Sequence, residues 1–307
     1  MKKDKRKLTV IDDSDDDTDT TMLTAKEGND IEAPQLAWTL HPHINKPCPS
    51  PAIEVFSVII GRENWKEMNI YGSIEVSFDY GGFSVFKKNE GVTVRLLEGR
   101  KSLPMLNGSG VFEDCCSLKL ECDLKDVCDS TLNIKGYVEW DAGVLSSSLF
   151  YDRHLCAVIQ GESGFAALHY SIFLSAVQAN LKVFYKPKKR LPETIDAPPS
   201  VWGSLLARCG KFEYLSQYSR DCYKTMLFER TEEDSIQIIG DGIVPLSRSV
   251  VVVVVVPSDS FLVIDADLTL YNQRLLCTRK FGIGTSFASV EFDEYDVYFE
   301  VEWSDIK

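Results

Sequence analysis

Seven consecutive valines, residues 250–256, constrain the fold more than any other stretch of this 307-residue chain. They are too few to cross a bilayer as a helix, which takes roughly 20 apolar residues, and Pro257 follows them directly. β-branched side chains lose rotamer freedom in a helix and pack well on a sheet, so the run predicts a strand covered on both faces. The Pro-Ser-Asp-Ser step at 257–260 predicts a turn, with residues 261–268 returning as the neighbouring strand. Such a hairpin must be buried, because it would aggregate if exposed.

Patterns of the same kind fill most of the chain from residue 52 to residue 306. Alternating or continuous apolar segments, rich in β-branched and aromatic residues, recur between turn signals. The predicted strands include residues 52–60, 70–78, 91–97, 117–124, 130–140 and 170–185. Residues 219–230 are the best candidate for a helix, and a strand is favoured even there. With 44% apolar residues to bury, the sequence predicts an all-β fold.

An internal repeat relates the two halves of the chain. The matched segments follow the same order in both halves and are 70–74 (IYGSI) with 201–205 (VWGSL), 117–124 (SLKLECDL) with 260–268 (SFLVIDADL), and the closing strands 179–186 (ANLKVFYK) with 297–305 (VYFEVEWSD). Chance similarity between β-rich segments is the alternative explanation. Many short strands in two units predict tandem β-sandwich-like domains related by internal duplication, with a single large sandwich as the alternative.

Composition divides the chain into four parts. Residues 1–50 combine a basic cluster, an acidic cluster and a Pro-rich approach, and blocks of like charge predict a disordered tail. Residues 51–188 are the predicted first β-sandwich domain, and residues 201–307 are the second. Residues 189–200 form a Pro-rich linker between them, because proline prevents continuation of the preceding strand.

Charge and cysteine usage limit the compartment and the partners. The net charge of −13 argues against nucleic acid or an anionic membrane as the main partner, because phosphate binding needs clustered Lys and Arg. The charged N-terminus lacks the apolar segment of a secretory signal. Nine cysteines, an odd number without a CxxC pair, indicate reduced thiols. We therefore expect a cytoplasmic protein, or a nuclear one if the basic cluster at residues 2–7 acts as a nuclear address.

Catalytic signatures are missing from the sequence. It contains no GxSxG, no GxxxxGK[ST], no GxGxxG after a strand and no HExxH. Residues 281–285 (FGIGT) resemble half of a glycine loop, and we interpret them as a turn or bulge. The four histidines are expected to be loop or packing residues: His41, His43, His154 and His169. We predict no enzyme, no catalytic residue and no cofactor.

Two sets of side chains are weak candidates for a metal site. Cys116, Cys122 and Cys128 recur at a spacing of six, but no histidine lies nearby to complete a zinc site. Five aspartates near predicted strand ends would suit calcium in their ligand type: Asp123, Asp126, Asp129, Asp265 and Asp267. Acidic residues at sheet margins usually serve solubility instead, so we predict no metal site and keep a calcium or lipid module as a minor alternative.

A longer pattern carries a family resemblance. Residues 241–251 follow the pattern DG-x-x-P-L-x-R-S-V-V, and AIEVFSVII (52–60) precedes IYGSIEV (70–76). Over residues 52–306, the chain resembles a plant domain of unknown function expanded in grasses, of the DUF6598 type. The same domain forms the carboxy-terminal half of the jasmonate-induced ribosome-inactivating proteins of cereals.

The resemblance implies little about chemistry. In the larger jasmonate-induced proteins, rRNA N-glycosidase activity belongs to a separate amino-terminal domain with a Glu-Ala-x-x-Arg helix, which this chain lacks. The domain has also been likened to a cap-binding translation factor, which would need two tryptophans to sandwich a methylated base. Strand settings favour core packing instead for the five tryptophans: Trp38, Trp65, Trp140, Trp202 and Trp303.

These observations lead to two functional expectations of different classes. The first is a non-enzymatic interaction module of a stress- or defence-related plant protein, which binds another, unidentified protein. The second is an accessory or remnant of an rRNA N-glycosidase that acts on ribosomes. Neither a membrane nor free nucleic acid is expected as a partner.

Overall fold

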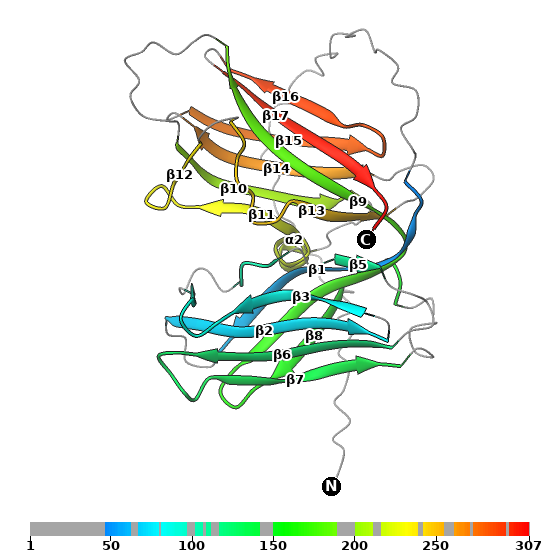
Figure 1. Ribbon diagram of the computed structural model, residues 1–307, viewed down its shortest axis with the longest axis vertical. Coiled ribbons are helices and arrows are strands. Elements are labelled where there is room, and N and C mark those ends of the chain that lie inside the picture. Colours follow the sequence, from blue (N-terminus) through cyan, green and yellow to red (C-terminus); the bar gives the residue numbers. More distant parts are fainter. Residues whose placement is uncertain are drawn as a thin grey trace, which may run out of the picture.

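The computed structural model describes residues 47–306 with gaps (Figure 1). Outside the described residues lie 1–46, 63–66, 80, 97–101, 107–108, 112–116, 142–149, 189–199, 211–215, 239–241, 255–260, 271–272, 293–294 and 307. The tail predicted at 1–50 and the linker predicted at 189–200 therefore lie almost wholly outside them. Nearly all regular structure in the described part is β-strand, which confirms the predicted all-β fold.

Three antiparallel sheets make up this fold, and we name them for their positions. The first outer sheet has the order β3-β2-β6-β7, with β4 also beside β2: β2 Met68–Phe78, β3 Gly81–Lys88, β4 Val94–Leu96, β6 Leu118–Asp126 and β7 Asn133–Trp140. The second outer sheet has the order β11-β10-β14-β15, with β12 also beside β10: β10 Ser200–Cys209, β11 Thr225–Arg230, β12 Ile236–Gln237, β14 Phe261–Leu270 and β15 Gln273–Gly282.

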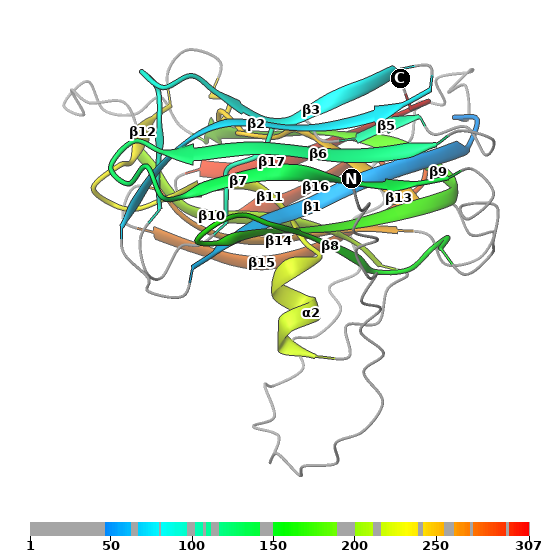
Figure 2. The ribbon, with the colours of Figure 1, turned by 90° about the horizontal axis from the view of Figure 1, so that it is seen from below.

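The third sheet, which we call the shared sheet, joins the two halves of the chain. Its order is β16-β17-β9-β1-β5, with β8 and β13 also beside β9: β1 Ser50–Gly61, β5 Ser109–Val111, β8 Leu155–Gln160, β9 Phe165–Pro187, β13 Val250–Val254, β16 Phe287–Glu291 and β17 Tyr295–Ser304. In Figure 2, β2 and β3 lie at the top of the view and β14 and β15 lie below. Strands β1 and β9 lie between these two pairs.

Strand β9 is 23 residues long and belongs to both units of the molecule. Tyr170 pairs with β1 on one side and β8 on the other. Asn180 pairs in the same way with β17 and β13. The first half of β9 therefore lies between β1 and β8, and its second half lies between β17 and β13.

The two units repeat one strand arrangement. The order β5-β1-β9-β8 in the first half of the shared sheet corresponds to β13-β9-β17-β16 in the second half. The outer sheets correspond strand by strand as well, including the short strands β4 and β12. Both also carry a bulge at the same step, after Ile74 in β2 and after Leu205 in β10. This repetition supports the predicted internal duplication.

One glycine in each unit shows why the repeat was visible in the sequence. Gly72 and Gly203 have φ angles of 121° and 117°, a region that side chains with a Cβ rarely adopt. A Cβ at these positions would lie 2.0 Å and 2.1 Å from the backbone oxygens of Asp123 and Asp267. Both positions therefore require glycine. The Asp-Leu pairs opposite them, Asp123-Leu124 and Asp267-Leu268, belong to the same local structure.

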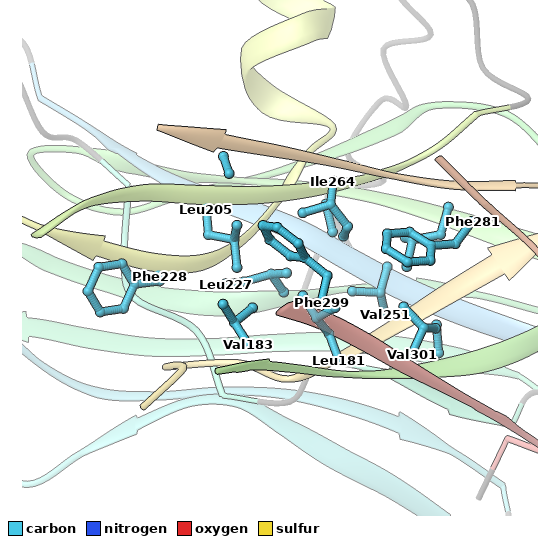
Figure 3. Close-up of a cluster of buried hydrophobic side chains, with 14 of the residues drawn as sticks. Leu181, Val183, Leu205, Leu227, Phe228, Val251, Ile264, Phe281, Phe299 and Val301 are labelled. Atoms are coloured by element: carbon cyan, nitrogen blue, oxygen red, sulfur yellow. The ribbon is translucent and has the colours of Figure 1, made fainter. Parts of the chain in front are cut away.

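Each unit has its own apolar core. In the first, residues of β1, β2, β6 and the start of β9 pack together. In the second, shown in Figure 3, Leu181 and Val183 of β9 and Phe299 and Val301 of β17 face Leu205 and other residues of the second outer sheet. The hydrophobic effect of closing two such cores stabilises the two-sandwich arrangement.

Residues 250–254 of the valine run form a strand, but the predicted partner of this strand is wrong. β13 pairs with β9 in the shared sheet, whereas β14 pairs with β10 and β15 in the second outer sheet. Val251 is fully buried and Val250 half-buried. The run therefore does not form a hairpin with residues 261–268, because the chain changes sheets between the two strands. Among the described residues, no helix has the length and apolar character needed to cross a membrane.

The third pair of matched segments is also wrong. Residues 179–186 and 297–305 are neighbours in the shared sheet, with Tyr185 paired to Val297. The predicted first domain ends at residue 188, directly after the end of β9. Strand pairing, however, places the last residues of β9 in the second unit. Of the helix candidate at 219–230, only its start lies in a helix, α2 (Gln217–Cys222), and the favoured strand is β11.

Candidate functional site

A buried ion pair joins the two units. Glu54 of β1 and Arg248, just before β13, are both fully buried, and their Oε1 and Nη2 atoms lie 2.8 Å apart. Thr225 Oγ1 donates a second hydrogen bond of 2.6 Å to the same Glu54 oxygen. Arg248 also donates to the backbone oxygens of Val55 (2.8 Å) and Val250 (2.9 Å). Burial lowers the pKa of Arg248, while Glu54 raises it. Arg248, the arginine of the pattern at residues 241–251, thus has a structural role: it positions β13 against β1.

A second polar cluster lies on the same face of β1. Ser57 Oγ donates to the backbone oxygen of Cys222 at 2.7 Å and lies 3.2 Å from His169 Nδ1. The Nε2 atom of His169 lies 2.6 Å from the hydroxyl of Tyr218 in α2. Because the Ser57 proton points to the Cys222 carbonyl, Nδ1–H of His169 donates to Ser57 and Nε2 accepts from Tyr218.

This geometry does not activate Ser57 as a nucleophile. A nucleophilic serine needs a base that accepts its proton, and here the histidine donates to the serine. Ser57 and His169 are also buried. The cluster instead fastens α2 to the shared sheet, beside β1 in Figure 1. In Figure 2, α2 projects away from the sheets.

His154 takes part in the same packing. Its ring stacks on Tyr223, with centroids 4.0 Å apart and an angle of 9° between the planes. Phe56 meets both rings edge-on. Burial lowers the pKa of His154 and of His169 to about 4, so both imidazoles are neutral near pH 7. Two of the four candidate histidines thus come together as packing residues, while His41 and His43 lie outside the described residues.

The candidate zinc cysteines do not converge. Cys122 is buried in the first core, and burial raises the pKa of its thiol to about 12. Cys128 is exposed, and Cys116 lies outside the described residues. All seven cysteines in the described part of the chain are free thiols.

The candidate calcium ligands each have protein partners. Asp126 accepts hydrogen bonds from the backbone N–H groups of Asn69 and Cys128. The other four lie in ion pairs: Asp123 with Lys135, Asp129 with Arg62, Asp265 with Arg208, and Asp267 with Arg274. Within the described ranges, no group of three or more His, Cys, Asp or Glu is placed to hold a metal ion.

The three described tryptophans lie in three different sheets. Trp140 is buried and packs near Tyr170, at 5.7 Å between ring centroids. Trp202 is half-buried in β10, and Trp303 of β17 donates from Nε1 to the backbone oxygen of Thr285. Trp38 and Trp65 lie outside the described residues. The described tryptophans therefore form no base-binding sandwich with one another.

A row of apolar side chains marks the outer face of the second half of the shared sheet. By outer face we mean the face turned away from the core of the same unit. Phe184 of β9 pairs in register with Tyr298 of β17 and with Ile243 at the sheet margin. Phe287 of β16 completes the row, which we call the aromatic row. Phe287 is 50% exposed and Ile243 is 44% exposed.

The rings of the aromatic row pack against one another. Phe184 and Tyr298 are stacked, with centroids 5.1 Å apart and planes 16° apart. Phe287 lies 5.3 Å from Tyr298 and 6.5 Å from Phe184. The stacked contact between Phe184 and Tyr298 occupies one face of each of these two rings.

Sequence reasoning missed the aromatic row, although each strand carried a signal. Phe184 lies between Lys182 and Lys186 in the two-residue period of β9, so it shares their solvent-facing side. Tyr298 lies in the same way between Asp296 and Glu300. The convergence of the three aromatics could not be inferred, because it depends on the pairing of β9, β17 and β16.

Comparison with protein-family models gives one clear result. The model of the domain of unknown function DUF6598 matches residues 52–288. The chain belongs to this family. The match begins in β1 and ends within β16, so β17 lies outside it. None of the curated proteins matches the sequence.

Solved structures show only distant similarity. The tandem C2 domains, A and B, of extended synaptotagmin 2 are 11% identical, with 90% of this chain and 100% of that chain covered and a TM-score of 0.25. A longer structure of the same protein, which adds its SMP domain, is 10% identical, covers 83% and 58%, and has a TM-score of 0.24. Human GIVD cytosolic phospholipase A2, in complex with an inhibitor and terbium chloride, is 10% identical, with coverages of 84% and 33% and a TM-score of 0.23. TM-scores this low support no statement about function.

Proposed function

We propose that this chain is a non-enzymatic interaction module that binds another protein through the aromatic row. The supporting observation is the contrast between the two outer faces of the shared sheet. In the first half, side chains of the second unit cover the face, and the buried Ser57–His169 pair lies beneath them. In the second half, Phe287 remains half exposed within a cluster of rings. Aromatic residues within a polar surround are typical of the centre of a protein–protein interface.

The resemblance to the plant domain supports a role for this module in a stress- or defence-related plant protein. A protein of this kind is expected in the cytoplasm or nucleus, where free thiols such as Cys128 stay reduced. The proposal needs no catalytic group and no cofactor. It also fits the absence of a recognisable catalytic motif in the sequence.

The proposal is tested by comparing proteins captured from stressed plant tissue by the full chain and by two variants. Phe184→Ser with Phe287→Ser removes two rings of the row. Leu276→Ser is the matched control, because Leu276 is 71% exposed on β15 of the second outer sheet. We expect at least one protein that the wild type and the control retain and the double variant loses. Identical capture by all three would refute this function.

The alternative, an accessory or remnant of an rRNA N-glycosidase, is tested separately. Purified ribosomes are incubated with substoichiometric amounts of the chain, and released adenine is measured. We expect no release above a buffer control. Adenine release with turnover would show an enzyme and overturn the non-enzymatic proposal.

A further inference from the structure

Strand β15 has an uncovered edge. Within the described part of the chain, β15 pairs only with β14. Its counterpart in the first unit, β7, is covered at its start by the turn between β8 and β9. There Glu162 N–H donates to the Asn133 oxygen, and Ser163 Oγ donates to the Thr131 oxygen. Among the described residues, no backbone hydrogen bond joins β15 to the turn between β16 and β17. The edge of β15 is therefore a template for a further strand.

The strand register shows which backbone groups of β15 point to this edge. Phe261 of β14 is in register with Gly282, but its carbonyl oxygen accepts from Gly210 N–H on the β10 side. Phe261 and Gly282 are therefore a non-hydrogen-bonded pair, and such pairs alternate with hydrogen-bonded ones along an antiparallel ladder. Every second residue of β15, counted back from Gly282, thus directs its N–H and C=O groups away from β14. These residues are Lys280, Thr278, Leu276 and Arg274.

The same edge is basic, although the whole chain carries a net charge of −13. β15 contains three cations and no carboxylate. Arg274 is paired with Asp267, but Arg279 and Lys280 have no ion-pair partner among the described residues. Arg279 donates to a backbone oxygen, and Lys280 lies over an aromatic ring. A strand added here would meet an apolar stretch at 275–277 first and unpaired positive charge at the end of β15.

The N-terminal part of this chain contains a segment with the complementary order of residues. Residues 8–11 (LTVI) are mostly apolar and β-branched, and six aspartates follow within residues 12–19 (DDSDDDTD). The first stretch favours a strand, and the second supplies negative charge. If the segment runs parallel to β15, residues 8–11 lie beside 275–277 and the aspartates lie beside Arg279 and Lys280. The opposite direction would instead place the basic residues 5–7 beside these two cations.

The described chain begins near the basic end of this edge. Cys48 N–H donates to Asp305 Oδ1 at 2.7 Å, so the first described residues lie beside the end of β17. Trp303 Nε1 donates to the oxygen of Thr285 at 2.9 Å, shortly after the end of β15. In Figure 1, the start of β1 and the C-terminal end of the chain lie on the same side of the molecule. Residues 20–46 separate the acidic cluster from this point, a length that reaches any part of β15.

We propose that residues 8–19 of this chain add to the free edge of β15 as a parallel strand. Residues 8–11 bond the outward backbone groups of β15, and the aspartates pair with Arg279 and Lys280. Because the segment is tethered near this edge, its effective concentration there is high. The docked segment prevents a strand of another molecule from pairing with β15. This inference is independent of the aromatic row, which lies in the shared sheet rather than in the second outer sheet.

Amide hydrogen exchange of the purified full chain, resolved residue by residue with NMR, tests the docking. The N–H groups of Leu276, Thr278 and Lys280 point away from β14, so they exchange slowly only if a further strand covers them. The N–H groups of Leu275 and Cys277 bond to β14 and serve as the internal reference. We expect slow exchange of both sets in the wild type.

A pair of double proline variants shows whether residues 8–11 provide the cover. Val10→Pro with Ile11→Pro removes two N–H donors from the segment, and we expect the outward amides of β15 to exchange at least about tenfold faster. Thr24→Pro with Ala25→Pro is the matched control, because it lies in the same N-terminal part but outside the segment. We expect the control to leave the outward amides slow and the reference amides unchanged.

An exchange of charges between the segment and the edge gives the most specific result. The edge variant reverses both unpaired cations of β15, and the segment variant reverses four aspartates. Each variant alone brings like charges together, and we expect it to accelerate exchange of the outward amides. The combination restores attraction with the signs exchanged, so slow exchange should return. Matching thermal melting curves show that the variants remain folded. The edge variant is Arg279→Glu with Lys280→Glu, and the segment variant is Asp12→Lys, Asp13→Lys, Asp15→Lys and Asp16→Lys.

Three outcomes would overturn the inference. Fast exchange of the outward amides in the wild type would show that the edge is bare. Slow exchange that survives the substitutions at Val10 and Ile11 would show that something else covers it. Protection that increases with protein concentration would mean that a second copy supplies the strand. None of these results bears on the proposed function, because capture of another protein through the aromatic row is measured separately.

Discussion

The two halves of the shared sheet have the same strand arrangement but different outer faces. In the first half, the register pair Ser57 and His169 is buried beneath α2 and its neighbours. In the second half, the outer face carries the register pair Lys182 and Glu300, and rings lie beside them. The connection β10–β11 spans residues 210–224, whereas its counterpart β2–β3 spans only residues 79–80. The longer β10–β11 connection includes α2, whose Tyr218 and Cys222 contact His169 and Ser57 on the covered face.

The comparison also shows how differently charges are used in the two settings. On the covered face, Glu54 and Arg248 are buried together. Removal of either one would leave the other charge buried without a partner. On the open faces, ion pairs such as Asp267–Arg274 are exposed and screened by water.

The largest effect is expected from Arg248→Ala. The substitution leaves the Glu54 carboxylate buried without its cation, and we expect the free energy of unfolding to fall by about 3 to 5 kcal/mol. Urea unfolding followed by circular dichroism measures this change. The double variant Glu54→Leu with Arg248→Met should lose much less, because no charge remains buried. Arg274→Ala, on the exposed counterpart, should leave stability unchanged; an equal loss there would show that burial is not the cause.

The next largest effect is expected at the two repeated glycines, Gly72 and Gly203. Gly72→Ala and Gly203→Ala each force a Cβ against a backbone oxygen at a positive φ, and we expect a loss of about 1 to 3 kcal/mol in both cases. Gly81→Ala is the control, since an added Cβ there meets nothing within 4 Å. Similar losses at the two sites would support their equivalence. A large loss at only one of them would argue that the repeats differ locally.

A pH titration should distinguish the covered face from the open one. The folded-state pKa of His154 and His169 is about 4, against 6.5 for an unperturbed histidine. The unfolded chain therefore binds more protons between these values, so the free energy of unfolding decreases as the pH falls from 6.5 towards 4. His169→Gln removes one titrating group and should flatten this decrease. An unchanged pH slope in the variant would contradict the low pKa of His169.

The smallest effect on stability is expected at the aromatic row. Phe287→Ser removes a half-exposed ring that packs on Tyr298 and should lower the free energy of unfolding by about 1 kcal/mol. Thermal and urea unfolding measure this, with Leu276→Ser as a companion substitution. A loss of several kcal/mol would mean that Phe287 belongs to the core of the second unit, and the row would then lose its role as a binding surface.

Much of the strand content could be predicted because its cause is local. The segments 52–60, 70–78 and 117–124 lie within β1, β2 and β6 or within a residue of them, since alternating burial leaves a two-residue period in the sequence. The match between Gly72 and Gly203 was visible for a related reason, because only glycine tolerates that backbone geometry. The FGIGT segment forms the predicted turn, with Thr285 N–H donating to the Gly282 oxygen.

Pairing could not be predicted in the same way. The valines of β13 satisfy the requirements of any buried strand, and their sequence does not specify β9 rather than β14 as the neighbour. The closing strands were mismatched because 179–186 and 297–305 are similar in pattern, while pairing makes them adjacent. The aromatic row could not be predicted for the same reason, because Phe184, Phe287 and Tyr298 come together only through the pairing of three strands.

The length of β9 makes the molecule indivisible. A fragment that began at β10 would lack the central strand of its own sheet, and β17 and β13 would have no common neighbour. A fragment that ended at residue 188 would carry an unpaired apolar ribbon beyond Ala176. Each fragment would thus supply the strand, or the vacancy, that the other needs for donor-strand complementation. Because one strand serves both sandwich units, neither unit could be deleted or recombined without the other. The two units could only be inherited together.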